Sequence, residues 1–311
     1  SAASDVYKRQ MQAYLLPPTD PGMDPGPEDI AKIPDGVDID AIYAMPVNNP
    51  TGRTMEPDRL RALIEAVLDR WPHAGIILDS VYVRLHPRYH KLLAWFDDDP
   101  RFADSIIFID SLSKSHGVTG LRSGALLTRA SRLRGGVVRY AQNVMAGPSN
   151  VKQAVVLGLI GPHASGEVEF SDYLVRLQTR IGKHLQRRRQ LLLREAFDNW
   201  GPYFDEEQPL LPDPKTFDWE GSMYAVPQLS DHCRKKAAER ELHPTVGFYL
   251  DSGIGGVPLD GFCRNPNLER HGLLVNAGSD ELEAFQKHAS RFVRLSFGMT
   301  PPPKRRRETD L

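Results

Sequence analysis

Three short apolar runs, each followed at once by a polar turn, limit what this chain can fold into more than any other feature. The runs span residues 41–47, 75–78 and 105–109. Apolar runs of this length that stop at Asn, Asp, Ser, Gly or Pro are typical of buried strands. We therefore expect three strands of one sheet, each of which leads into a polar turn.

Helical periodicity between these runs indicates the class of the fold. Pro57 suits the first turn of a helix, and the segment after it has one apolar face, made of Leu60, Leu63, Ile64, Val67 and Leu68. Strands that alternate with helices predict an α/β fold with a mostly parallel sheet sandwiched by helices. Ligands bind at the carboxyl ends of such strands, so the three polar turns are expected to share one site.

The turn after the third run has the densest group of polar side chains. Ser111 and Ser113 supply hydroxyls, Lys114 supplies a primary amine, and Arg122 supplies a guanidinium. Hydroxyls and a guanidinium can bind a phosphate, and an amine can form an imine with a carbonyl compound. A lysine in a polar loop is more often a solvated surface charge, so this turn alone leaves both interpretations open.

Composition excludes several classes of protein. The 311 residues are 41% hydrophobic and 25% charged, and a net charge of -1 gives no basic field that would favour nucleic acid. Cys233 and Cys263 form no CxxC pair, which argues against a disulfide framework or a structural zinc site. No apolar run approaches the roughly 20 residues that span a bilayer, and no secretory signal pattern begins the sequence. We expect a cytoplasmic protein without nucleic-acid or membrane partners and without a metal site.

The chain divides into segments of different composition. Residues 1–10 lack continuity with the residues after them and look like a translated sequencing adapter, so we expect them to lie outside the fold. Residues 11–200 are expected to form a large domain that is only partly present, with a long domain-joining helix near its end. That helix is expected to span 173–197 and to have one apolar side. Its other side carries basic residues, among them Arg189, and we expect this basic side to be solvated.

A smaller α+β domain is expected over residues 201–300. Its first part, 202–219, is rich in Pro and Asp and marks the boundary. The tail, 301–311, is Pro-rich and then basic, which is typical of disorder. We expect strands at 223–226, 272–275 and 292–297, helices at 232–241 and 280–288, and an irregular Gly- and Pro-rich piece at 251–267.

The three turns together resemble one enzyme family. Asn-Pro-Thr-Gly begins at Asn49, Asp-x-x-Tyr runs from Asp79 to Tyr82, and Ser-x-Ser-Lys ends at Lys114, eight residues before Arg122. With Arg294 in Phe-Val-Arg-Leu-Ser-Phe-Gly near the end, this order resembles the class I/II aminotransferases, which are pyridoxal-phosphate-dependent enzymes of fold type I. The resemblance extends over about residues 42–298.

The resemblance implies a role for each of these residues. Lys114 would hold pyridoxal 5'-phosphate as an imine and serve as the base, and Asp79 would lie beneath the pyridine nitrogen. Tyr82 and Asn49 would hydrogen-bond the phenolic oxygen of the ring. Ser111, Arg122 and Ser113 would bind the phosphate, and Arg294, with Asn49, would bind the substrate's α-carboxylate. His116 adjoins Lys114, but the lysine already supplies acid/base chemistry, so we do not assign His116 a catalytic role.

The sequence also departs from the family pattern. Ser222 replaces a glycine that is usual in the small-domain strand, and the piece at 251–267 is longer than the family norm, either as part of a substrate pocket or as a surface insertion. No segment before Asp40 matches the family's phosphate-cradling helix start or its ring-stacking aromatic residue. We expect that on the order of 100 residues of a family-sized chain are absent. The chain would then bind the cofactor weakly or not at all and have an unpaired sheet edge.

The function that the resemblance implies is transfer of an amino group between an amino acid and a 2-oxo acid by a homodimeric enzyme. Two alternatives remain open. A lyase or decarboxylase of the same fold would share the cofactor residues. A transcription regulator with an aminotransferase-like effector domain would require a DNA-binding segment upstream.

Overall fold

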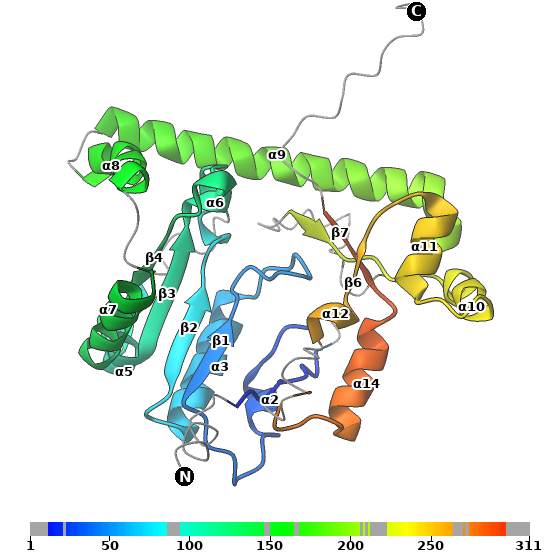
Figure 1. Ribbon diagram of the computed structural model, residues 1–311, viewed down its shortest axis with the longest axis horizontal. Coiled ribbons are helices and arrows are strands. Elements are labelled where there is room, and N and C mark those ends of the chain that lie inside the picture. Colours follow the sequence, from blue (N-terminus) through cyan, green and yellow to red (C-terminus); the bar gives the residue numbers. More distant parts are fainter. Residues whose placement is uncertain are drawn as a thin grey trace, which may run out of the picture.

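A parallel sheet with one antiparallel edge strand forms the first half of the molecule. The computed structural model describes residues 12–20, 23–85, 94–145, 150–164, 168–205, 208, 211, 223–263, 270 and 274–296. In these, β1 (Ala41–Ala44), β2 (Gly75–Asp79) and β3 (Ile106–Ser111) are parallel neighbours, and β4 (Gly124–Leu127) pairs antiparallel with β3. The three predicted strands are therefore adjacent, and their carboxyl ends lie at one edge of the sheet (Figure 1).

One helix face covers much of this sheet. Helix α3 (Pro57–Arg70) begins with Pro57 at its first turn and buries all five residues of its predicted apolar face. These side chains pack in one cluster with Ile76, Leu78 and Phe108 from the strands. Complete burial of such a side chain stabilises the fold by about 1.5–3 kcal/mol, which explains why this part of the sequence pattern was reliable.

The first strand is shorter than the sequence predicts. It ends at Ala44 rather than at residue 47, and the chain then forms a tight loop. Pro46 has no N–H for a sheet ladder, and Val47 forms an antiparallel bridge with Thr54 instead. The backbone N–H of Asn48 donates to the Arg53 carbonyl at 2.8 Å, and Gly52 has a φ of 77°, in the left-handed region that glycine favours.

Short helices connect the other strands. A 3-10 turn, η1 (Val83–Leu85), follows β2, and α4 (Trp95–Asp98) and α5 (Pro100–Ser105) lead into β3. Helix α6 (Leu112–Ser115) and the 3-10 turn η4 (Thr119–Leu121) separate β3 from β4.

Three longer helices follow β4. They are α7 (Ser131–Met145), α8 (Asn150–Ala164) and α9 (Val168–Trp200). Helix α9 has 33 residues and extends past both sheets, as expected of a domain-joining helix (Figure 1). The sequence interpretation of Arg189 was wrong. It is only 4% exposed, because it lies in the turn that follows the buried Leu185.

The second half is built on a small antiparallel sheet. It has the order β5 (Tyr224–Ala225), β7 (Val293–Ser296) and β6 (Val257–Pro258). Helices α10 (Asp231–Glu239), α11 (Pro244–Ser252), α12 (Asp260–Cys263) and α14 (Asp280–Ala289) surround it. The sequence analysis did not predict α11. The strand expected at 272–275 is reduced to one bridge at Leu274 in the part that is described, and residues 272 and 273 lie outside the described residues.

The N-terminal segment contacts the second sheet although we assigned it to the first domain. Ala13 forms a parallel bridge with Leu274, and Asn276 Nδ2 donates to the Leu15 carbonyl at 2.7 Å. Met23 packs with buried residues around Phe292. Helix α2 (Pro27–Ile30) then returns the chain to α3. The boundary between 11–200 and 201–300 stays a prediction.

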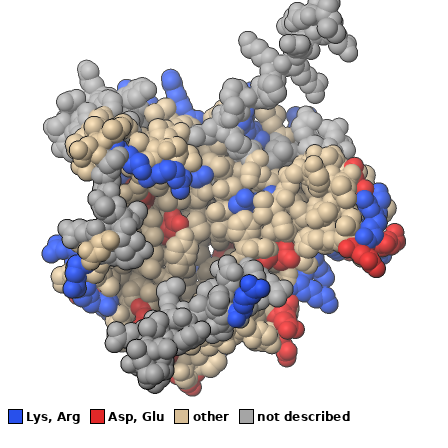
Figure 2. Space-filling model, viewed as in Figure 1, with Lys and Arg blue, Asp and Glu red and all other residues tan. Residues whose placement is uncertain are grey.

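Both outer edges of the four-stranded sheet lack a strand neighbour within the described ranges. On β1, Tyr43 is 58% exposed, and on β4, Leu126 is 49% exposed. Both side chains are large. In a mostly parallel sheet, the faces of the strands are usually covered by helices, so such side chains are usually buried. The face drawn in Figure 2 carries interspersed basic and acidic groups, not one continuous basic surface.

Candidate active site

The carboxyl ends of β1, β2 and β3 face the small sheet, and side chains from both halves meet there (Figure 1). The loop after β1 contributes Asn49, the end of β2 contributes Asp79 and Tyr82, and α6 contributes Lys114. Strands β5 and β7 contribute Tyr224 and Arg294.

Asn49 and Arg294 are in direct contact. Nη1 of Arg294 donates to Oδ1 of Asn49 at 2.9 Å. The sequence analysis assigned both residues to the same substrate group, and the fold brings them together from opposite ends of the chain.

The Arg294 guanidinium lies between two aromatic rings. Its central carbon is 4.6 Å from the Tyr224 ring centroid and 4.7 Å from that of Phe262, which belongs to α12. Its Nε is buried and has no hydrogen-bond partner among the described residues. A buried, unsatisfied guanidinium N–H costs free energy, so this group is suited to an anionic partner.

Lys114 presents its amine to the same space. Ser111 caps α6, since its Oγ accepts from the Ser113 N–H at 3.1 Å, and this fixes the start of the turn that carries Lys114. Lys114 Nζ lies 3.7 Å from Met223 Sδ and 5.6 Å from the Tyr82 ring centroid. In the described part of the chain, no carboxylate lies within ion-pair distance of it. The amine is therefore half-buried beside an aromatic ring and a thioether and is not committed to a salt bridge.

Tyr82 is buried between the two halves. Its hydroxyl lies 3.0 Å from that of Tyr224, and the two rings meet edge to face at 6.1 Å between centroids. Burial, followed by the Tyr224 hydrogen bond, raises the pKa of Tyr82 above its ordinary value. Tyr82 is therefore a neutral hydrogen-bonding group over the ordinary pH range.

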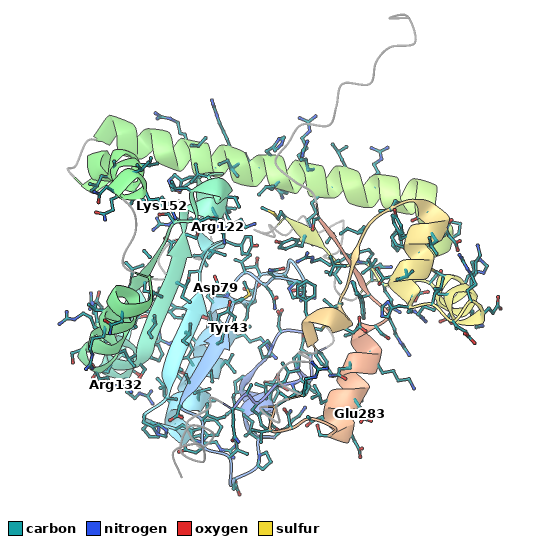
Figure 3. All side chains as sticks on the ribbon, in the orientation of Figure 1. Tyr43, Asp79, Arg122, Arg132, Lys152 and Glu283 are labelled. Atoms are coloured by element: carbon teal, nitrogen blue, oxygen red, sulfur yellow. The ribbon has the colours of Figure 1, made fainter. Side chains whose placement is uncertain are left out.

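Asp79 has a partner that the sequence analysis missed. The Tyr43 hydroxyl, from the neighbouring strand, donates to Asp79 Oδ2, and the Val81 N–H donates to Oδ1 at 3.3 Å. Tyr43 pairs with Ile77, two residues before Asp79, so both side chains share one face of the sheet (Figure 3). Burial and then the Asp79 hydrogen bond raise the pKa of Tyr43. The strand alternation was a signal that could have identified this pair.

The predicted phosphate ligands are near one another in the chain, and no hydrogen bond is found between their side chains among the described residues. Ser111 Oγ donates to the Ser123 carbonyl at 3.0 Å while it caps α6. The Ser113 carbonyl accepts from Thr119 at 3.0 Å. Arg122 is exposed, with a φ of 51°, and its guanidinium has no hydrogen bond or ion pair with the described residues (Figure 3).

His116 is turned toward its own neighbour. Its Nδ1 lies 2.8 Å from Ser115 Oγ, and burial, followed by the positive charge of Arg84, lowers the pKa of the imidazole. That His116 has no catalytic role stays a prediction.

Three further residues at the site were not singled out in the sequence as functional: Met223, Tyr224 and Phe262. The first two lie in the motif whose preceding Ser222 departs from the family, and Ser222 itself is outside the described residues. Phe262 lies in the piece at 251–267, for which a pocket and a surface insertion were both open. Its contact with Arg294 favours the pocket.

Within the described residues, the combined arrangement offers an amine without an ion pair, a carboxylate, two paired tyrosines and an arginine whose Nε has no hydrogen-bond partner. No group of three or more His, Cys, Asp or Glu side chains suited to a metal occurs in the described residues. None of the described helices is long and apolar enough to cross a membrane.

Comparison with known proteins identifies a family that the chain matches. A sequence profile described as aminotransferase class I and II matches residues 27–205. The histidinol-phosphate aminotransferase of Yersinia enterocolitica is 30% identical over 92 residues, which cover 30% of this chain and 22% of that protein. The histidinol-phosphate aminotransferase of Serratia proteamaculans is 31% identical over 100 residues, which cover 32% of this chain and 25% of that protein.

Solved structures show the same fold. N-succinyldiaminopimelate aminotransferase from Mycobacterium tuberculosis has a TM-score of 0.57 at 19% identity and covers 90% of this chain. An aspartate aminotransferase double mutant from Thermus thermophilus has a TM-score of 0.56 at 17% identity and covers 88% of it. The chain spans 59% and 56% of those two chains, so it corresponds to little more than half of their length.

Proposed function

Because the chain belongs to the class I and II aminotransferase family, we propose that its protein transfers an amino group between an amino acid and a 2-oxo acid with pyridoxal 5'-phosphate. The observation that supports this most is the Arg294–Asn49 contact beside Lys114 and Tyr82. This contact places Arg294, which can bind a carboxylate, in the same site as the amine of Lys114.

The donor set fits the cofactor. The primary amine of Lys114, which has no salt bridge among the described residues, is available for its aldehyde, and the carboxylate of Asp79 is available for its ring nitrogen. The exposed guanidinium of Arg122 is available for its phosphate. Ser111 could take part only by turning its hydroxyl away from the Ser123 carbonyl, so its role as a ligand is the least direct.

Each residue has a distinct task in this proposal. When bound, the cofactor supplies a ring that accepts electrons from the α-carbon of the substrate. Lys114 would hold the cofactor through Nζ and would serve as the base that moves a proton. Asp79 would favour the protonated ring nitrogen, and Tyr43 holds the Asp79 carboxylate in place through its hydrogen bond.

Substrate binding depends on the other half of the molecule. Arg294 binds the α-carboxylate through the donors that Asn49 does not use, and Asn49 fixes the plane of the guanidinium. Tyr82 and Tyr224, both buried, keep water from the side of Lys114 that faces the small sheet. Ser113 is a secondary phosphate ligand in this proposal.

We also propose the homodimeric, cytoplasmic enzyme implied by the family, with a cofactor domain at 11–200 and a small domain at 201–300. Sedimentation of the purified protein checks the dimer. Limited proteolysis checks the boundary, for which we expect the first cut between residues 202 and 219.

The test of the proposal is direct. The chain, and in parallel the protein expressed from its full coding sequence, is incubated with pyridoxal phosphate, and the visible absorption spectrum is recorded. We expect a cofactor band in the longer protein, and amino transfer from a panel of amino acids to pyruvate or 2-oxoglutarate. A cofactor band with release of CO₂ or an elimination product, and without amino transfer, would favour the decarboxylase or lyase alternative. Absence of the band from both proteins would overturn the proposal.

A further inference from the structure

Two tyrosines from different halves of the molecule form a buried hydroxyl pair. Tyr82 follows β2, Tyr224 lies on β5, and 142 positions separate them in the sequence. They are 3% and 8% exposed, and their hydroxyl oxygens are 3.0 Å apart. A buried hydroxyl usually has a partner, and here each tyrosine provides one for the other.

Each ring of this pair contacts a different cationic group of the site. The Tyr224 ring lies 4.6 Å from the Arg294 guanidinium, and the Tyr82 ring lies 5.6 Å from Lys114 Nζ. The pair therefore connects the proposed carboxylate-binding residue to the residue that holds the cofactor.

The direction of the hydrogen bond follows from counting protons. A phenol has one proton to donate and can accept another hydrogen bond at its oxygen. If Tyr82 donates its proton to the ring oxygen of the cofactor, as the family resemblance implies, it must accept from Tyr224. The structure leaves Tyr82 no other proton for that bond.

We propose that Tyr224 is a positioning residue: its hydroxyl donates to Tyr82 and so strengthens the hydrogen bond that Tyr82 makes to the cofactor ring, while its ring supports Arg294. This inference rests on the proposed function and names a residue that the sequence did not single out. A hydroxyl that accepts a hydrogen bond becomes a better donor, because the bonds in a chain polarise one another.

The measurable consequence is the protonation equilibrium of the bound cofactor. A weaker bond from Tyr82 leaves negative charge on the ring oxygen less stabilised, so protons are held more tightly and the pH midpoint of the visible band rises. In Tyr224→Phe we expect a rise of roughly a few tenths of a pH unit, since only part of one hydrogen bond is lost. The charged groups that also act on Tyr82 are Asp79, Lys114 and Arg294, and all three are retained in this variant.

A double variant separates this role from a general structural one. In a Tyr82→Phe background, the change Tyr224→Phe is expected to leave the midpoint where Tyr82→Phe alone puts it. Because phenylalanine keeps the ring beneath Arg294, KM for the amino donor should change by less than about twofold in Tyr224→Phe. Tyr203→Phe is the matched control. It removes a hydroxyl that bonds the Asp251 carbonyl at 3.1 Å within the second half, and no shift is expected.

A measurement without cofactor tests the hydroxyl pair itself. In thermal unfolding of the chain, the fall in Tm of the double variant should be smaller than the sum of the two single falls, because both variants break the same bond. Additive losses in Tm, or an equal midpoint shift with and without Tyr82, would overturn the inference. If the unmodified protein shows no cofactor band at all, it is the proposed function that fails.

Discussion

Asn49 and Arg294 lie 245 positions apart in the sequence, and a hydrogen bond of 2.9 Å from Nη1 of the arginine to Oδ1 of the asparagine joins them. This contact sets the plane of a guanidinium whose Nε has no partner in the described part of the chain. Asn49→Ala would leave a second donor unpaired and the guanidinium free to rotate.

Asn49→Ala is therefore expected to raise KM for the amino donor about 10-fold or more, since a hydrogen bond to a charged group contributes roughly 1.5–3 kcal/mol. The effect on kcat should be smaller. Steady-state kinetics on the cofactor-loaded protein measure both. Asn48→Ala is the control, because the hydrogen bonds found for Asn48 use only its backbone. An equal rise in KM for both variants would contradict a specific role for Asn49.

Lys114→Ala should abolish covalent attachment of the cofactor and lower the rate of amino transfer by several orders of magnitude, because Lys114 supplies both the amine and the base in the proposed mechanism. The visible band and single-turnover rates are the measurements. Lys287→Ala, on the exposed side of α14, should leave both unchanged. Retained transfer in Lys114→Ala would contradict the mechanism.

Phe262→Leu should weaken substrate binding while leaving the cofactor in place. One of the two rings that contact Arg294 is lost, and a cation–π contact contributes about 0.5–2 kcal/mol, so KM should rise roughly 2- to 30-fold. Phe262→Tyr should retain the parental KM. Tyr249→Leu, an exposed aromatic residue on α11, serves as the control, and an unchanged KM in Phe262→Leu would show that the 251–267 piece is only a surface insertion.

Asp24 should make stability depend on pH. Its Oδ2 lies 3.4 Å from Arg53 Nε, but burial outweighs this and raises the pKa of the carboxyl to about 6. The folded state then binds a proton more tightly than the unfolded state. This stabilisation is complete below about pH 4 and is lost as pH rises through 6.

The free energy of unfolding of the parent protein should fall by about 2–3 kcal/mol between pH 4 and 7 because of Asp24, and Asp24→Asn should remove this fall. Urea unfolding at a series of pH values measures it. Carboxylates with lowered pKa values, such as Asp29, give the opposite slope at lower pH in both proteins and cancel in the comparison. Asp58→Asn, an exposed site on α3, should keep the parental slope. If Asp24→Asn also keeps it, the burial argument is wrong.

Two helical glycines should respond in opposite directions to alanine. A Cβ at Gly247 would lie 2.6 Å from Ala237 Cβ, where α11 packs on α10, so Gly247→Ala should cost about 1–3 kcal/mol through overpacking. A Cβ at Gly135 on α7 meets nothing within 4 Å, and alanine there should stabilise by up to about 1 kcal/mol. Thermal unfolding of both variants checks the contrast, and equal signs would contradict it.

Much of the fold was predictable because its causes are local. The apolar face of α3 and the strand cores of β2 and β3 are set by residues within a few positions of one another. The two errors have different causes, one local and one tertiary. Pro46 shortened β1, and the burial of Arg189 could not be read from a helix face whose neighbours were unknown.

The sequence by itself determined the order of the motifs, the class of the sheet and the candidate residues Asn49, Asp79, Tyr82, Lys114 and Arg294. Only the tertiary structure decided which of them touch. The Asn49–Arg294 bond and the Tyr82–Tyr224 pair join residues from both halves of the chain, and the two rings beside Arg294 come from separate elements of the second half. Such contacts depend on how two sheets pack, and packing is the sum of many weak interactions that no local pattern records.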